Sequence, residues 1–563
     1  MNQMNQMNPR VWLVPPVFRD DSTRTRTSWT WRLETTENAT QDRREKAEVE
    51  AKAEVQMRTG RSSLSLNLDL NLLQGGRTFQ HPASERAVMH GGLEDTICAI
   101  ATPIGEGGIG IVRLSGPQAL VVASQVVRLR SGVPLSSVLS HTLHLADLVI
   151  PASDKRKEAR VVHKRAPVSG LFDEALVVYM KAPRSFTAED VVEIQSHGGA
   201  LVLGMVCKVC IESGARMAEP GEFTKRAFLN GRLDLSQAEA VLDTIRATSS
   251  AGLNIAQRQL RGDLAREVEQ ARTSLLTVLA HVEAGIDFVD EDISFLQRDE
   301  LVRIVGAACA VVQKLEATAQ DGRILREGAR VVILGCPNVG KSSLLNRLLR
   351  EERAIVTAIP GTTRDVIEES IDLDGVMIRL IDTAGLRETD DIAEQEGIKR
   401  TRAAQEEADL LLVVVDGTVP LTSDDRDLLS AVRDRKHVVL LNKADLADTV
   451  VTDAALAGHR VCIISAKTGL GVEMMKSALR TQLVSGGFEA AESVTVTNVR
   501  HRDALRRAGE SLGQALESVQ RGMAGELVSI DVRTAADALG EITGAITTDE
   551  ILGRIFSEFC IGK

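Results

Sequence analysis

Residues 331–343 hold the feature that most restricts how this chain can fold. Four apolar residues, three of them β-branched, run into the pattern Gly335-x-x-x-x-Gly340-Lys341-Ser342, and apolar residues then continue at helical spacing over 344–349. This order predicts a strand, a phosphate-binding loop and a helix. The two glycines let the backbone curl so that successive N–H groups point at one spot, where the N-terminus of the helix adds partial positive charge. Chance glycines in a strand-turn-helix are the alternative, but the strand before the loop and the helix after it favour phosphate binding.

Two side chains of this loop predict a nucleoside triphosphate bound with magnesium. We expect Lys341 to reach the β and γ phosphates and the hydroxyl of Ser342 to hold Mg²⁺. Residues 357–365 follow as a loop rich in hydroxyl groups, and Thr363 is the one we expect to complete the Mg²⁺ shell when a γ-phosphate is present.

A strand-like run over 377–381 leads into Asp382-Thr383-Ala384-Gly385. A carboxylate at Asp382 can hold Mg²⁺ directly or through water, and the N–H of Gly385 can reach the γ-phosphate. Ras-like enzymes position water with a glutamine just after such a turn, whereas this chain has Leu386 followed by Arg387. Another residue must therefore orient the water.

The loop over 388–397 is acidic, and Glu394 or Glu396 could orient water through a second water molecule. A solvated loop without this role is the alternative. No single arginine can be identified from the sequence as an arginine finger.

The base is predicted by a buried strand, 438–441, that ends in Asn442-Lys443-Ala444-Asp445. A carboxylate there can accept hydrogen bonds from N1–H and the exocyclic amine of guanine, and adenine lacks this pair of donors. Another strand ends in Ser465-Ala466-Lys467, whose backbone N–H can meet guanine O6. GTP is therefore preferred to ATP. The predicted GTP contacts are Asn338, Val339, Gly340, Lys341, Ser342, Ser343, Thr357, Ala358, Ile359, Pro360, Gly361, Thr362, Thr363, Asp382, Thr383, Ala384, Gly385, Asn442, Lys443, Ala444, Asp445, Ser465, Ala466 and Lys467.

Length and composition predict a soluble protein of several domains. The chain has 563 residues, of which 44% are apolar and 26% charged. No run approaches the ~18 apolar residues of a membrane span. The formal net charge of -11 argues against nucleic-acid binding by bulk positive potential, although a local basic patch could serve. Seven scattered cysteines indicate reduced thiols and a cytoplasmic location, and Cys207 and Cys210 read as buried thiols because no second ligand pair follows them.

The order of patterns predicts an inserted domain. Residues 1–92 look disordered or belong to an over-long gene start, and a mitochondrial transit peptide is the alternative. Residues 93–213 read as a small α/β domain, 214–327 as helical, 328–485 as the nucleotide domain and 486–563 as helical again. The predicted helical features are an amphipathic stretch over 255–282 and a capping box within 235–240. A basic cluster reads as a solvated helix face, with an RNA site as the less favoured alternative, and consists of Arg500, His501, Arg502, Arg506 and Arg507.

From about residue 95 to 563 the chain closely resembles the tRNA modification GTPase family, which works on the wobble uridine with a flavoprotein partner. The resemblance rests on Ala101-Thr102-Pro103 with the glycine loop that ends at Gly116, on 185–199, 220–239 and the GTPase motifs, and on the tail 552–563. It implies an α/β folate-binding domain that dimerises, a discontinuous helical domain and an inserted Ras-like GTPase domain.

The resemblance also implies site residues. Asn338 matches the family's potassium ligand, with Thr357, Ile359 and Thr362 completing the cage. Glu394 matches the water-orienting glutamate, so Lys341 and Glu394 are the predicted catalytic residues. The positions that match the tetrahydrofolate contacts are Arg113, Glu193, Arg232 and Lys563, and Arg232 stands where some members carry lysine. For Cys560, whose base partner is not visible, a structural or chance role is preferred to that of a nucleophile.

The leading hypothesis is thus a potassium-activated GTPase that installs an aminomethyl-type group on C5 of the wobble uridine of tRNA. It implies a homodimer, a heterotetramer with a FAD-containing partner, and GTP, Mg²⁺, K⁺ and a tetrahydrofolate derivative as cofactors. A regulatory RNA-binding GTPase of ribosome assembly is the alternative, and it would have no use for the folate-contacting positions.

Overall fold

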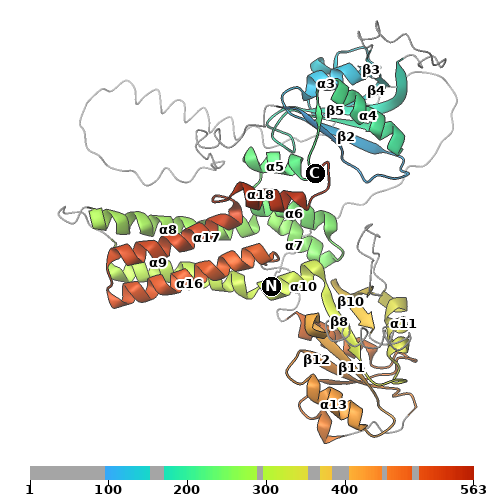
Figure 1. Ribbon diagram of the computed structural model, residues 1–563, viewed down its shortest axis with the longest axis vertical. Helices are drawn as coiled ribbons and strands as arrows, with labels where there is room; N and C mark the ends of the chain where they lie inside the picture. Colours follow the sequence, from blue (N-terminus) through green and yellow to red (C-terminus); the bar gives the residue numbers. More distant parts are fainter. Residues whose placement is uncertain are drawn as a thin grey trace, which may run out of the picture. The chain divides into compact units, whose positions relative to one another are not determined.

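The computed structural model describes residues 95–151, 170–287, 296–352, 368–373, 375–382, 405–446, 453–484 and 494–563. The predicted N-terminal extension, 1–92, lies outside these residues. The described elements group into two sheets and a set of long helices (Figure 1). Among the described residues, no helix is both long enough and apolar enough to cross a bilayer.

The first sheet has seven strands in the order β3-β4-β5-β6-β2-β1-β7. Neighbouring strands are antiparallel except β1 and β7. Helices α3 and α4 cover one face, where Val112, Leu148, Ile194 and Leu203 are fully buried. The elements are β1 (Ile97–Ile100), β2 (Gly110–Ser115), α3 (Ala119–Val126), β3 (Val127–Leu129), η2 (Leu135–Ser137), β4 (Leu143–Val149), β5 (Leu171–Met180), β6 (Val191–Ser196), α4 (Ala200–Glu212) and β7 (Arg216–Met217).

The second sheet has six strands in the order β13-β12-β11-β8-β10-β9, and only β9 runs antiparallel to its neighbour. Val331 and Ile333 pack with α11 and α14 on one face, and Val332 and Leu334 belong to the cluster on the other face with α13. Burial on both faces explains why this strand is an unbroken apolar run. The elements are β8 (Ala329–Leu334), α11 (Lys341–Glu352), β9 (Glu368–Leu373), β10 (Val376–Asp382), β11 (Leu410–Asp416), α13 (Ser423–Ala431), β12 (His437–Asn442), η4 (Ala454–Leu456), β13 (Val461–Ile463) and α14 (Val472–Leu483).

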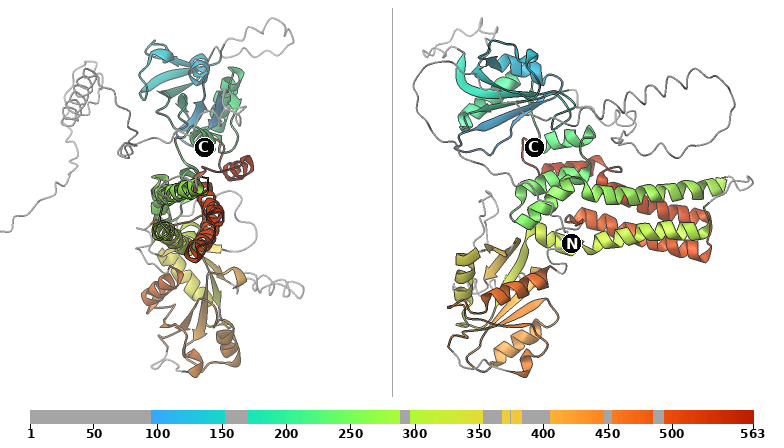
Figure 2. Two further views of the ribbon diagram at one scale, coloured as in Figure 1. Left: turned by 90° about the vertical axis from the view of Figure 1, so that its left-hand side faces the viewer. Right: turned by 180° about the vertical axis from the view of Figure 1, so that it is seen from behind.

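Helices that precede and follow this sheet in the sequence pack into one bundle. Helices α8, α9, α16 and α17 lie side by side (Figures 1 and 2), and Leu275, Val312, Leu512 and Leu539 are fully buried in their shared core. The residues of the second sheet therefore lie between two halves of one helical core. The helices are α5 (Glu222–Leu229), α6 (Leu235–Arg246), α7 (Ser250–Leu260), α8 (Asp263–Asp287), α9 (Arg298–Ala317), α10 (Ala319–Glu327), α16 (Val499–Arg521), α17 (Gly525–Thr543) and α18 (Asp549–Ser557).

The amphipathic stretch over 255–282 is helical, as predicted, but it is divided between two helices. Helix α7 ends at Leu260, and α8 begins at Asp263. Between them Gly262 has a φ of 83°, a left-handed conformation that ends a helix. The hydrophobic period continues across this break because both helices bury an apolar face, so periodicity alone could not locate it.

A capping box does begin α6, but it is made by Asp234 and Gln237. The Asp234 side chain accepts a hydrogen bond from the backbone N–H of Gln237, and the Gln237 side chain accepts one from the N–H of Asp234. Glu239, which lies within the predicted segment 235–240, has a different role that is described with the charged pocket below.

Gly322 on α10 lies against the segment that returns from the second sheet. A Cβ at this position would stand 2.0 Å from the carbonyl oxygen of Val496, whose N–H donates to Thr318 Oγ1 at 3.0 Å. We expect Gly322→Ala to lower stability by about 1–3 kcal/mol, because the two segments cannot separate without breaking their packing.

Gly513→Ala is the matched control, since a Cβ at this exposed position on α16 meets nothing within 4 Å. It should stabilise the helix by up to about 1 kcal/mol. Thermal unfolding followed by circular dichroism measures both variants, and an unchanged Tm for Gly322→Ala would contradict the close approach.

Candidate functional site

The carboxyl ends of β8, β10 and β12 lie at one edge of the second sheet. They end at Leu334, Asp382 and Asn442, where the three predicted nucleotide motifs begin. In open sheets of parallel strands, ligands bind outside the carboxyl ends of the strands. The edge is therefore the expected place for a nucleotide, although the Asp382 side chain lies outside the described part of the structure.

The glycines of the phosphate loop have conformations and surroundings that exclude larger residues. Gly335 has a φ of 149° and Gly340 a φ of 102°. A Cβ would lie 2.3 Å from the carbonyl oxygen of Val414 in the first case and 2.2 Å from Nδ2 of Asn442 in the second. The loop is thus held closely against two neighbouring strands, which fixes the directions of its N–H groups.

Lys341 begins α11 and closes the loop. Its Nζ donates to the carbonyls of Gly335 and Cys336, each at 2.9 Å. Ser342 and Ser343 are exposed in the first turn of the helix, whose N–H groups have no partner within the helix. Asn338 is also exposed and has a φ of 64°. The loop, the lysine and the helix N-terminus together form a cradle suited to phosphate groups.

Asn442 joins the phosphate loop to the loop predicted to meet the base. Its Nδ2 donates to the Val339 carbonyl at 2.8 Å, and its Oδ1 accepts from the Ala466 N–H at 2.9 Å. The side chain is buried. In the same region Asp445 Oδ1 accepts from Ser465 Oγ at 2.6 Å, which orients the carboxylate. The predicted base-recognition residues are therefore brought together by their own hydrogen bonds.

Two residues of this region were missed in the sequence. Asp416 ends β11, and its Oδ2 pairs with Lys443 Nζ at 2.7 Å. Burial opposes its ionisation, but the hydrogen bonds from Lys443 and Thr418 keep the pKa of Asp416 below its ordinary value. Arg347 on α11 donates to the carbonyls of Ala466 and Lys467. Asp416 could have been found in the sequence, because it ends an apolar run just as the other nucleotide motifs do.

Part of the predicted site lies outside the described residues. This applies to Thr357, Ala358, Ile359, Pro360, Gly361, Thr362, Thr363, Thr383, Ala384, Gly385 and Glu394, together with the alternative Glu396. The roles assigned to them remain predictions.

On the first sheet, Arg113 and Glu193 face each other on β2 and β6. They are paired in register, and Arg113 Nε and Nη2 lie 2.9 Å and 2.8 Å from Glu193 Oε1. Arg113 Nη1 also donates to the carbonyl of Gly562 at 3.4 Å, next to the C-terminal Lys563. Burial and the positive charge of Arg113 lower the pKa of Lys563, while Glu193 opposes them. The tail therefore lies against this ion pair.

The tail is fixed by the turn that precedes α5. Pro220 forms a β-bridge with Ile561, and the N–H of Gly221 donates to the Cys560 carbonyl at 3.4 Å. Gly221 has a φ of 67°, and a Cβ there would lie 2.6 Å from the Phe556 carbonyl oxygen. The turn must therefore keep a glycine to approach the end of α18.

Arg232 reaches the same neighbourhood through Phe186. Its Nη1 donates to the Phe186 carbonyl at 2.7 Å, and its Cζ lies 5.2 Å from the centre of the Phe186 ring. Arg113 Cζ lies 5.5 Å from the centre of the same ring. Burial lowers the pKa of Arg232. The four residues that the resemblance connected with folate thus occupy one region.

Comparison with known proteins decides the family. A family model described as the MnmE helical domain matches residues 235–560, and one described as the N-terminus of the GTP-binding protein TrmE matches 96–232. The tRNA modification GTPase MnmE of Heliobacterium modesticaldum is 46% identical over 478 residues, which cover 83% of this chain and 99% of that protein. This chain belongs to the tRNA modification GTPase MnmE family. The MnmE of Chloroflexus aurantiacus is 48% identical over 474 residues, covering 84% of this chain and all of that protein.

As a member of the MnmE family, the chain is a GTP hydrolase of tRNA modification, which confirms the predicted enzyme class. Its multidomain architecture of α/β and helical parts is also as predicted. Among solved structures, the G domain of the T. maritima FeoB iron transporter aligns with 27% of this chain at 28% identity, with a TM-score of 0.22. That score is too low for a comparison of whole folds.

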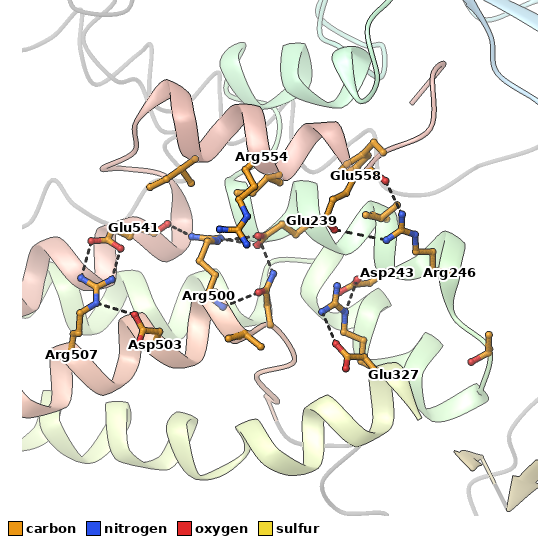
Figure 3. A pocket seen from close by; sticks show the side chains of 18 of the residues that line it. Glu239, Asp243, Arg246, Glu327, Arg500, Asp503, Arg507, Glu541, Arg554 and Glu558 are labelled. Carbon is orange, nitrogen blue, oxygen red and sulfur yellow. Dashed lines mark hydrogen bonds and ion pairs between the residues drawn. The ribbon is translucent and has the colours of Figure 1, made fainter. Parts of the chain in front are cut away.

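A charged pocket of about 870 Å³ lies between α6, α16 and α18 of this MnmE-family chain (Figure 3). At its wall, Glu239 Oε2 is 2.7 Å from His501 Nε2 and 2.8 Å from Arg500 Nη2. Burial by itself raises the pKa of Glu239, but His501 and Arg500 outweigh it and bring the value to about 2. The prediction of a solvated basic face is therefore wrong for Arg500 and His501, which both point inward to the carboxylate of Glu239 on α6.

The cysteine predictions can be compared with the structure directly. Cys207 and Cys210 are buried on α4, as predicted, and Cys560 is exposed. Within the described ranges, no three side chains of His, Cys, Asp or Glu are grouped so that they could hold a metal ion.

Proposed function

We propose that this MnmE-family GTPase is activated by potassium and works with a FAD-containing partner. Together they would add an aminomethyl or carboxymethylaminomethyl group to C5 of the wobble uridine of certain tRNAs, with a one-carbon unit from tetrahydrofolate. The observation that carries the proposal is the hydrogen bond from Arg113 to the Gly562 carbonyl, which joins positions 449 residues apart beside Glu193. A tail that reaches this ion pair is what a folate site completed by Lys563 requires.

The chemistry of these side chains fits a folate. Oε1 of Glu193 is taken by Arg113, whereas its Oε2 accepts no hydrogen bond from the described residues. A carboxylate oxygen can accept from the N3–H and 2-amino groups of a pterin, and Arg113, Arg232 and Lys563 can pair with the glutamate carboxylates. When bound, tetrahydrofolate supplies the one-carbon unit.

In the GTP site, the phosphate loop would donate its N–H groups to the phosphates and Lys341 would turn from its two carbonyls to the β and γ phosphates. Ser342 and Thr363 would hold Mg²⁺, and Glu394 would orient the attacking water. The residues that would hold K⁺ are Asn338, Thr357, Ile359 and Thr362. When bound, the two cations supply positive charge beside the phosphates, where negative charge develops during hydrolysis.

The potassium assignment predicts a specific loss for Asn338→Ala. Without the side-chain oxygen, we expect the stimulation of GTP turnover by K⁺ over Na⁺ to fall by about tenfold or more, while turnover in Na⁺ changes little. Turnover measured at constant Mg²⁺ and ionic strength with each cation gives the ratio.

Asn346→Ala is the control, because Asn346 is exposed on α11 away from the loop. It should keep the full K⁺ stimulation. Equal stimulation of the Asn338→Ala variant would refute the cation cage.

An apolar patch on the first sheet supports the proposed homodimer. Leu143, Leu145 and Leu176 are exposed to 56%, 42% and 39% on the face opposite α3 and α4. The strand register places Leu145 beside Leu176, and Val178 between Leu143 and Glu193. A second copy of this chain could cover the patch with its own patch about a two-fold axis. The dimer interface would then adjoin the folate residues.

Binding of 5-formyl-tetrahydrofolate tests the folate part of the proposal. In equilibrium dialysis the full chain should bind the ligand, and Arg113→Ala should remove binding, because Arg113 joins Glu193 to the tail. Arg128→Ala is the control and should bind the ligand normally. Arg128 lies on β3, and its described hydrogen bonds go to the backbone carbonyls of Ser124 and Val127. A wild-type chain that does not bind would refute the folate function.

A further inference from the structure

Phe186 is shared by two arginines of the proposed folate site. The Cζ atoms of Arg113 and Arg232 lie 5.5 Å and 5.2 Å from the centre of its ring. Both distances are in the range of cation–π contacts. Arg113 also meets a second ring, since its Cζ lies 5.7 Å from the centre of the Phe223 ring. One phenyl ring thus touches cations from two separate elements.

The position of Phe186 is itself well determined. Its ring is half-buried against Ile97, Ala99 and Phe223, which are fully buried. The residues before and after it in the chain are also held by hydrogen bonds. Ser185 Oγ donates to the Glu189 carbonyl, and the buried Thr187 hydroxyl lies 2.7 Å from Ser115 Oγ. The ring is therefore a fixed surface and does not follow the arginines.

The two arginines depend on this ring to different degrees. Arg113 also has Glu193 and the Gly562 carbonyl as partners. For Arg232, the side-chain contacts among the described residues are the carbonyl and the ring of Phe186. A long side chain with few partners has many rotamers, so removal of the ring should free Arg232 most.

We propose that Phe186 is a positioning residue of the folate site, which holds Arg232 and Arg113 in the directions that the ligand needs. The inference rests on the proposed folate function. It assigns Phe186 no contact with the ligand, so its effect must pass through the arginines. This separates it from direct stacking of the ring on the pterin, which would not need Arg232.

Two substitutions of Phe186, one that removes the aromatic ring and one that keeps it, test this role. In the full chain we expect Phe186→Leu to weaken binding of 5-formyl-tetrahydrofolate by about five- to twentyfold, because leucine keeps the apolar contact but lacks the π face. Phe186→Tyr keeps the face and should stay within about twofold of wild type. Isothermal titration calorimetry measures the affinities, with GTP turnover and Tm as checks on folding.

A double variant distinguishes positioning from stacking. If the ring acts through Arg232, Phe186→Leu should weaken binding by less than about twofold when Arg232→Ala is already present. Phe172→Leu, at a partly buried position of β5 that packs against the core of the same domain, controls for loss of a phenyl ring. It should leave the affinity unchanged.

The outcomes are distinct. A wild-type chain that does not bind folate removes the proposed function and this inference together. A wild-type chain that binds, with Phe186→Leu equal to it or Phe186→Tyr as weak as Phe186→Leu, overturns only the inference. A full effect that persists in the Arg232→Ala background also overturns it and indicates stacking on the ligand.

Discussion

Asp445→Asn should lower the affinity for GTP by about two to three orders of magnitude and should create affinity for xanthosine triphosphate. A carboxylate accepts from both N1–H and the 2-amino group of guanine, whereas an amide presents one oxygen and one donor. Xanthine has a carbonyl oxygen in place of the 2-amino group and can accept from that donor. Because Ser465 Oγ already holds Asp445 Oδ1 at 2.6 Å, the substituted side chain should keep its orientation.

Competition with a fluorescent guanine nucleotide measures both affinities. Asp427→Asn, on the exposed surface of α13, makes the same change of charge in the same sheet domain and should bind GTP as wild type does. If Asp445→Asn retained its affinity for GTP, or lost it without gaining xanthosine triphosphate, the assignment of the base site would be wrong.

Glu239→Ala should destabilise the helical part by about 3–5 kcal/mol, because it leaves the buried His501 and the Arg500 guanidinium without their carboxylate. Glu239 is 8% exposed and His501 1% exposed, so their interaction is largely shielded from water. Glu517→Ala is the control, since its pair with Arg521 lies on the surface of α16. Such a pair is worth about 1 kcal/mol or less. Urea unfolding followed by helical circular dichroism compares the two.

The pKa of Glu239 gives the same interaction a pH dependence. Its pKa falls from 4.5 to about 2 on folding. A shift of this size corresponds to roughly 3 kcal/mol. Because the folded value is the lower one, the stabilisation is complete above pH 4.5 and disappears as the pH falls toward 2. Stability of Glu239→Gln should change less than wild type over this window, and parallel curves would contradict the ion-pair network.

The strand, loop and helix of the candidate nucleotide site could be predicted because their evidence is local. A strand, a loop and a helix are adjacent in the sequence, so Gly335, Gly340 and Lys341 could be placed without knowledge of the fold. The proposed folate region brings β2, β6, the turn before α5 and the C-terminal tail together, and no spacing rule connects Arg113 with Gly562 across 449 positions. Only the family resemblance indicated those residues.

Phe186 and His501 were not recognised from the sequence, because the contacts that matter for each are with residues far away in the chain. Phe186 lies in a segment that supports the resemblance, but its proposed role depends on Arg113 and Arg232, which come from separate elements and meet its ring only in the fold. His501 looked like part of a solvated basic stretch because its carboxylate, Glu239, comes from the other half of the helical core. Partners of this kind cannot be recognised from a single sequence.

Nucleoside mass spectrometry of tRNA tests the central claim most directly. Cells in which the gene is deleted should carry wobble uridines without the C5 aminomethyl-type group, and the wild-type chain should restore it. Asp445→Asn and Arg113→Ala should each fail to restore it, because the first substitution disables the GTP site and the second disables the proposed folate site. Unchanged wobble uridines in the deletion strain would contradict the account.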